Sequence, residues 1–161
     1  MNNFSDLRGV NANLGTETVV VNNFGISTAA TALALGAAIV TIIDGVYYTQ
    51  SAQTVIAFTT GLTTQTADTL CLYGVWAGKT GGDWKVYQGD IVDASKFSAG
   101  LVNLPLPPMG SAGMAPVGLL RILVANTAGA SFAPGSTALS NANVTDTYYD
   151  LFTYPARPFT S

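Results

Sequence analysis

The stretch Ile43–Gln50, IDGVYYTQ, decides the fold class of this chain, because it places an Asp-Gly pair between two runs of strand-forming residues. Asp-Gly is favoured in two-residue hairpin turns, where both central residues need a positive φ. The flanking segments, Ala38–Ile43 and Val46–Gln50, are rich in the β-branched and aromatic residues that favour strands. We therefore expect a β-hairpin that turns at Asp44 and Gly45.

Charged residues are scarce on both sides of this hairpin. Asp44 is the only charged residue between Thr18 and Ala67, and charged residues make up 9% of the 161-residue chain, against about 25% in an average soluble domain. The chain is 48% hydrophobic and holds 17 glycines, which is typical of strands and turns. A monomer with so few charges has little colloidal protection, so we expect neighbouring subunits to cover part of its surface.

A second hairpin is expected where KTGG, residues 79–82, separates two further strand-like segments. Gly81 and Gly82 would both supply a positive φ. The hairpin would bring Trp76 and Trp84 onto nearby strands, where aromatic residues often form cross-strand pairs. Residues 89–100 are expected to hold one short helical turn. The proline-rich stretch 104–116 is expected to be an extended connector, because its prolines are incompatible with a regular helix or an interior strand.

Other strands follow from runs of apolar and β-branched residues between turn residues. They are expected within 18–27, 31–35, 54–61, 69–78, 83–92, 117–126 and 144–152. About eight short strands predict an all-β, single-domain sandwich or barrel with an extended N-terminal arm. The expected divisions are an arm of residues 1–17, a β-rich core of residues 18–152 and a C-terminal tail of residues 153–161.

The residues needed for catalysis are mostly missing. The chain has no histidine, so the commonest general base and metal ligand are absent. Asp90 with Asp93 and Asp146 with Asp150 are the acid pairs closest to a catalytic pattern, but turn and strand-start roles explain these residues better. The lone Cys71 lies in an apolar run and is expected to be a buried small hydrophobe. We therefore expect no enzyme activity, no cofactor and no metal.

Nucleic acid and membrane are also disfavoured as partners. The six lysines and arginines are scattered and the net charge is −3, whereas phosphate binding needs clustered cations. Residues 26–43 are uncharged, but Gly36, the hydroxyl residues and a β-branched second half favour strand over a spanning helix. The N-terminus lacks the basic and apolar regions of a secretory signal, so none is expected.

The N-terminal residues 1–17 offer a candidate docking segment. Phe4, Leu7, Val10 and Leu14 are three or four residues apart, which could form one face of a helix. Glycines and asparagines weaken that helix, so an arm that orders on docking and a frayed terminus are both open interpretations.

Four segments in a fixed order resemble small virion structural proteins of tailed bacteriophages, and look like head decoration, or cement, proteins. They are IIDGVYYTQSAQTVIAFT, CLYGVWAG with KVYQGDIV, LPLPPM with APVGLLRILV, and FAPGSTALSNANVTDTYYDL, together spanning about residues 39–150. The resemblance implies a β-rich subunit, commonly trimeric, on the outside of the capsid shell.

From this resemblance we expect a protein that stabilises a phage head by bridging capsomers. The expected partners are the major capsid protein and further copies of the chain, in a trimer, and the capsid-binding residues would be Phe4, Leu7, Arg8 and Val10. A tail-fibre or head-fibre module that binds a host receptor or glycan is the alternative. A fimbrial or surface-layer subunit would normally carry a secretion signal. A sugar platform could use the tyrosines and tryptophans, although most lie at strand positions.

Overall fold

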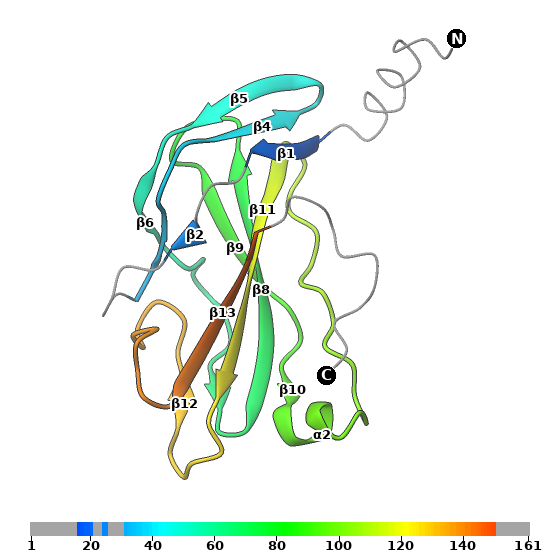
Figure 1. The fold of residues 1–161 in the computed structure, drawn as a ribbon, viewed down its shortest axis with the longest axis vertical. Coiled ribbons are helices and arrows are strands. Elements are labelled where there is room, and N and C mark those ends of the chain that lie inside the picture. Colours follow the sequence, from blue (N-terminus) through cyan, green and yellow to red (C-terminus); the bar gives the residue numbers. More distant parts are fainter. Residues whose placement is uncertain (1–15, 21–23, 26–30, 151–161) are drawn as a thin grey trace.

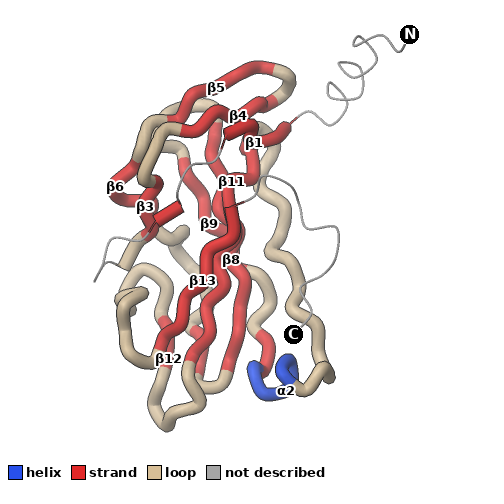
Figure 2. Tube along the Cα trace, viewed as in Figure 1, coloured by secondary structure: helices blue, strands red, loops and turns tan. Residues whose placement is uncertain are grey.

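The computed structural model describes residues 16–20, 24–25 and 31–150, whose regular structure is nearly all β-strand (Figures 1 and 2). The sheets are antiparallel and none closes into a barrel, which confirms the predicted all-β class and leaves an arrangement of open sheets. Thirteen strands are described where about eight were expected, because several expected strands are divided and two-residue strands are added.

The strands are listed here in chain order: β1 (Thr16–Val20), β2 (Phe24–Gly25), β3 (Leu33–Leu35), β4 (Ile39–Ile43), β5 (Val46–Gln50), β6 (Gln53–Ile56), β7 (Gln65–Thr66), β8 (Thr69–Gly78), β9 (Trp84–Gln88), β10 (Val92–Asp93), β11 (Met114–Val124), β12 (Ser131–Phe132) and β13 (Val144–Asp150). The helix α2 (Ala94–Ser98) follows β10, within the expected region 89–100. No helix among these residues is long and apolar enough to cross a membrane.

The largest sheet has the order β10-β8-β11-β13, with β9 also paired to β8. Its long strands β8, β11 and β13 run side by side along the long axis of the molecule (Figure 1). β8 is buried along almost its whole length. Such burial on both faces explains why TLCLYGVWAG reads as a nearly continuous apolar run instead of an alternating one.

The two faces of β8 pack into two different hydrophobic cores. Cys71, Tyr73, Val75 and Ala77 face the larger core, whereas Leu70 and Leu72 face the smaller one. In the smaller core, Phe97 of α2 and Leu104 of the following segment cover the sheet. The short helix and the proline-rich segment therefore act as a second layer over β8.

Two three-stranded sheets, β1-β4-β5 and β2-β3-β6, form the other main part of the structure. β4 pairs with β1 on one side and with β5 on the other. β3 pairs with β2 on one side and with β6 on the other. The predicted turn joins β4 to β5, with φ values of 53° at Asp44 and 77° at Gly45. Positive φ at both residues is what a two-residue hairpin turn requires, so the predicted hairpin is confirmed.

The predicted hairpin at residues 79–82 is also confirmed, but its details differ. Gly82 has a φ of 91°, whereas Gly81 is not in the positive-φ region. Trp84 lies opposite Ala77, and Trp76 lies opposite Lys85. Opposite residues share a face and successive residues alternate, so the two tryptophans project from opposite faces of the hairpin. The two tryptophans lie on neighbouring strands, as expected, but they do not form a cross-strand pair.

Strand β11 begins inside the proline-rich region. Met114 and Pro116 pair with Gly78 and Trp76, so the expected connector ends before Met114 and not at residue 116. The register then shifts between Pro116 and Gly118, which leaves Val117 as an extra, fully buried residue. A β-bulge is one of the few places where a sheet accepts proline.

The expected domain limits are only partly within the described residues. Thr16 and Glu17, which were assigned to the arm, belong to β1 and pair with Ile43 and Ile42. Residues 1–15 and the tail at 153–161 lie outside the described residues.

Candidate functional site

The expected capsid-binding residues Phe4, Leu7, Arg8 and Val10 lie outside the described residues, so their role stays a prediction. The candidate surfaces below come from residues 31–149.

The acidic residues serve structural roles where their contacts are described. Asp93 is the N-cap of α2, where its Oδ1 accepts a hydrogen bond from the Lys96 backbone N–H at 2.8 Å. Asp68, with φ of 57°, accepts a hydrogen bond from the Ser95 hydroxyl at 2.6 Å. Across the described part of the chain, no group of three acidic, cysteine or histidine side chains could hold a metal ion.

Cys71 is fully buried on β8, as expected. Burial raises the pKa of its thiol from 9.0 to about 12, and the Sγ–H donates to the Gly89 carbonyl at 3.3 Å. A thiol of this kind carries almost no thiolate at neutral pH, so it is a poor nucleophile.

A chain of polar side chains, buried at Gln65 and Tyr73 and half-buried at Gln88, runs from the larger core toward the surface. The Tyr73 hydroxyl donates to Gln65 Oε1 at 2.9 Å and accepts from Gln88 Nε2 at 3.0 Å. Gln88 also binds the backbone of Thr63, accepting from its N–H at 2.7 Å and donating to its carbonyl at 2.8 Å. Every step is a hydrogen bond within the fold, so this network is a structural tie between loop and sheet.

The same loop protects the free edge of β9. The Thr59 hydroxyl accepts a hydrogen bond from the Val86 N–H at 3.0 Å, and Gln88 holds Thr63 beside the strand. Residues 54–61 were expected to be one strand, but β6 ends at Ile56. In the rest of the segment, the Thr59 side chain binds the Val86 N–H of β9 without forming a sheet ladder.

The turn between β4 and β5 is tied to the turn between β8 and β9. The ammonium of Lys79 lies 2.6 Å from Asp44 Oδ2, and this contact raises the pKa of Lys79. Immediately beyond the turn, Val46 and Tyr47 are exposed, with Tyr47 leaving 70% of its surface accessible. Tyr47 therefore lies on the surface and outside the core.

A second exposed apolar group lies on the connector, defined here as residues 99–113. Leu101 and Met109 are each 74% exposed, and Leu106 is also exposed. The sequence does not indicate their exposure, because this proline-rich part of the chain has no periodicity from which an outward face could be predicted.

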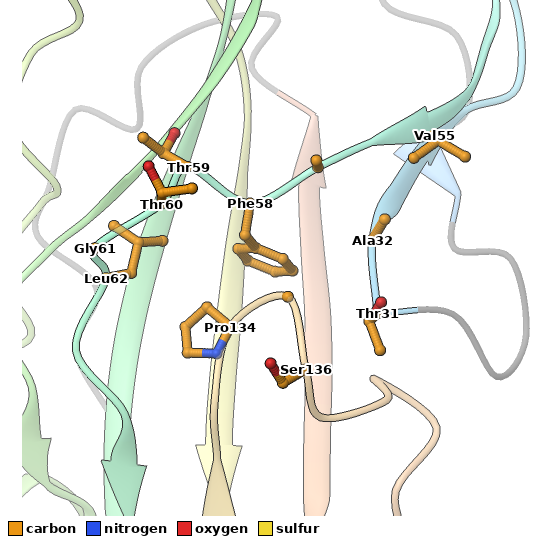
Figure 3. Close-up of a pocket in the computed structure, with 12 residues that line it drawn as sticks. Thr31, Ala32, Val55, Phe58, Thr59, Thr60, Gly61, Leu62, Pro134 and Ser136 are labelled. Atoms are coloured by element: carbon orange, nitrogen blue, oxygen red, sulfur yellow. The ribbon is translucent and has the colours of Figure 1, made fainter.

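An open pocket of about 370 Å³ lies between the segment 57–62, the start of β3 and the turn at Pro134 and Gly135 (Figure 3). Its lining is apolar or hydroxylic, with no ionisable group among the lining residues. Phe58 is its one aromatic residue, and that ring packs edge-on against Tyr73 and Phe132 in the core. The pocket therefore lacks the exposed aromatic face that sugars stack on, and it lacks groups for acid–base chemistry.

Comparison with protein-family models, with curated proteins and with solved structures finds no match to this chain. The candidate surfaces are therefore defined by their own geometry.

Proposed function

We propose that this protein is a capsid decoration, or cement, protein that binds the outside of a bacteriophage head and bridges capsomers. The observation that carries the proposal is that large apolar side chains are exposed at three places: the start of β5, Val55 on β6, and the connector. Exposed apolar groups of this size on a body with few charges mark surfaces for protein contacts.

The positions of the resembling segments support the proposal. The segment IIDGVYYTQ forms the β4–β5 hairpin, and APVGLLRILV forms the bulged strand β11. In FAPGST, the Thr137 hydroxyl accepts a hydrogen bond from the Ala133 N–H at 3.0 Å, which closes the turn after β12. These segments form a hairpin, a bulged strand and a turn, which are features that determine the fold.

The proposed partners are the major capsid protein and further copies of the chain, with a trimer as the expected assembly. In this proposal Phe4, Leu7, Arg8 and Val10 bind the shell, and ordering them would be offset only by capsid contacts. The proposal assigns the protein no catalytic activity and no cofactor.

The first test is the copy number of the protein in purified virions after heads are separated from tails. Several hundred copies on heads would support a shell-covering protein. A few copies on tails would instead favour the fibre alternative, in which the protein binds a receptor or glycan. Absence from the particle would contradict both.

The second test removes the proposed arm. The deletion should stop at residue 15, because Thr16 and Glu17 pair with β4. The truncated protein should keep its oligomeric state but lose binding to purified capsids. Undiminished capsid binding would remove the arm from the proposal.

A further inference from the structure

Strands β5 and β6 follow each other in the chain and are the outer strands of two separate three-stranded sheets, β1-β4-β5 and β2-β3-β6. Within the described residues, β5 pairs only with β4 and β6 only with β3. Figure 1 shows the two strands along the upper and left boundary of the molecule. Their outer backbone groups therefore form a row that no described strand of the fold occupies.

The β5 part of this edge lacks the protection that natural edge strands usually carry, because β5 pairs with β4 without a register shift, whereas the pairing of β6 with β3 has a bulge. Lysine, proline, bulges or covering loops normally prevent edge strands from pairing with other chains. The segment from Gly45 to Ala67 contains no charged residue and no proline. Its exposed side chains include the apolar Val46, Tyr47 and Val55.

The other long sheet has protected outer strands. The free side of β9 is held by Thr59 and, through Gln88, by Thr63. The outer strand β13 carries the carboxylate of Asp146, opposite Ile122. The β5–β6 edge differs from these outer strands because it carries no charge and no described side chain from another segment binds its outer backbone.

We propose that the β5–β6 edge pairs antiparallel with the same edge of a second copy of this chain, across a twofold axis. Like charges opposite each other destabilise paired strands, and this edge brings none to meet its own copy. The nearest charges, Asp44 and Lys79, neutralise each other at 2.6 Å. The uncharged edge of a second copy can therefore add to this edge without charge repulsion. The two copies would use the same surface, so the interface would be isologous.

Self-pairing would cover the apolar side chains that now face solvent. Tyr47 and Val46 of one copy would lie against uncharged residues of the other, where aromatic and β-branched cross-strand pairs are favourable. At β5, the pairing would join the β1-β4-β5 sheets of the two copies into one six-stranded sheet. The proposal does not rest on the phage assignment, because it concerns the purified chain alone.

The test is the mass of the full chain in solution, measured by light scattering after size exclusion at several concentrations. The wild type should contain an even number of 16.6 kDa chains, so that the trimer expected for a decoration protein would be paired into a hexamer. Thr49→Lys and Thr54→Lys, at exposed positions of β5 and β6, should each halve that mass. Thr145→Lys, at an exposed position of the outer strand β13, is the matched control and should leave the mass unchanged.

Several results would overturn the proposal. They are a monomeric or odd-numbered wild type at about 100 µM, edge variants with unchanged mass, or a control variant with the same loss. A monomeric wild type whose capsid binding is lost in Thr49→Lys would assign the edge to a strand of another protein.

Disulfide cross-linking tests independently whether the edges of two copies lie side by side. Cys71 is buried and its pKa is raised, so introduced cysteines would be the reactive thiols. Single substitutions Thr49→Cys, Ser51→Cys and Thr54→Cys lie along the edge, and positions near the twofold axis should form disulfide-linked dimers. Ser98→Cys, exposed on α2, should not. Failure of all edge positions to cross-link would contradict the twofold pairing.

Discussion

Gly110 lies directly against the indole ring of Trp76, and a Cβ built on residue 110 would overlap the ring atoms. Trp76 projects from β8, and Gly110 belongs to the connector, so this contact fixes how closely the connector approaches the sheet. The glycine is required here by lack of space.

We therefore expect Gly110→Ala to destabilise the protein by about 1–3 kcal/mol, the usual cost of overpacking. Urea unfolding followed by tryptophan fluorescence measures the change. Trp76→Leu combined with Gly110→Ala should cost less than the sum of the two single changes, because the smaller side chain leaves room. Strictly additive effects would show that the alanine does not meet Trp76.

The bonds between Tyr73 and Gln88 predict a coupled effect on stability. Tyr73→Phe leaves Gln65 Oε1 without its donor and should cost about 1–3 kcal/mol. Gln88→Leu should cost a similar amount, since it also releases the backbone of Thr63. The double variant should show a coupling of about 0.5–3 kcal/mol.

The matched control for this cycle is Tyr87→Phe, because the Tyr87 hydroxyl bonds Ser111 in a more exposed place. Its cost should be clearly smaller than that of Tyr73→Phe. Equal costs at the two tyrosines would argue against a special contribution of the buried network.

Alkaline pH should destabilise the protein through its buried acids. Burial raises the pKa of the Cys71 thiol from 9.0 to about 12, and it also raises the pKa of Tyr73 and Tyr148 above the usual 10.0. Between the ordinary and the raised pKa, the unfolded chain has lost the proton and the native protein has kept it. Stability is therefore full below pH 9 and falls above it, by about 1.4 kcal/mol per pH unit for each such proton.

Urea unfolding between pH 7 and pH 11 checks this dependence. Cys71→Val removes the group with the lowest ordinary pKa, so its decline should begin about one pH unit later, near the tyrosine value of 10.0. A stability that stays constant to pH 11 in the wild type would contradict the prediction.

The hairpin turn predicts a backbone effect. Gly45→Ala places a Cβ on a residue with φ of 77°, which should cost about 1–2 kcal/mol because L-residues disfavour this region. Gly81→Ala is the control, since Gly81 has open space around it and no positive φ. The measurement is again urea unfolding, and equal costs at the two sites would show that the φ at residue 45 is not limiting.

The sequence predicts the parts of the fold whose causes are local. Asp44-Gly45 and KTGG lie in turns, and the apolar run at residues 69–78 is the central strand β8, because turn chemistry and burial act over a few residues. The pairing of β8 with β11 had no such local cause. It joins segments that are far apart in the chain, so no short pattern indicates it.

Two errors have a common physical origin in register. The Trp76–Trp84 pairing failed because Trp84 lies opposite Ala77, and a shift of one residue moves a side chain to the other face. Pro116 was excluded from a strand because the bulge beside it could not be foreseen. The exposure of Tyr47 and Leu101 could not be predicted, because outward-facing apolar residues resemble core residues in sequence.

The bulge at Val117 also marks where the length of this chain can change. Pro116 pairs with Trp76 and Gly118 with Val75, which are neighbours on β8. Loss of residue 117 would thus leave the pairing partners of both halves of β11 unaltered, at the expense of one buried valine. We expect homologous chains, once compared, to tolerate a one-residue deletion here more readily than anywhere else in this strand.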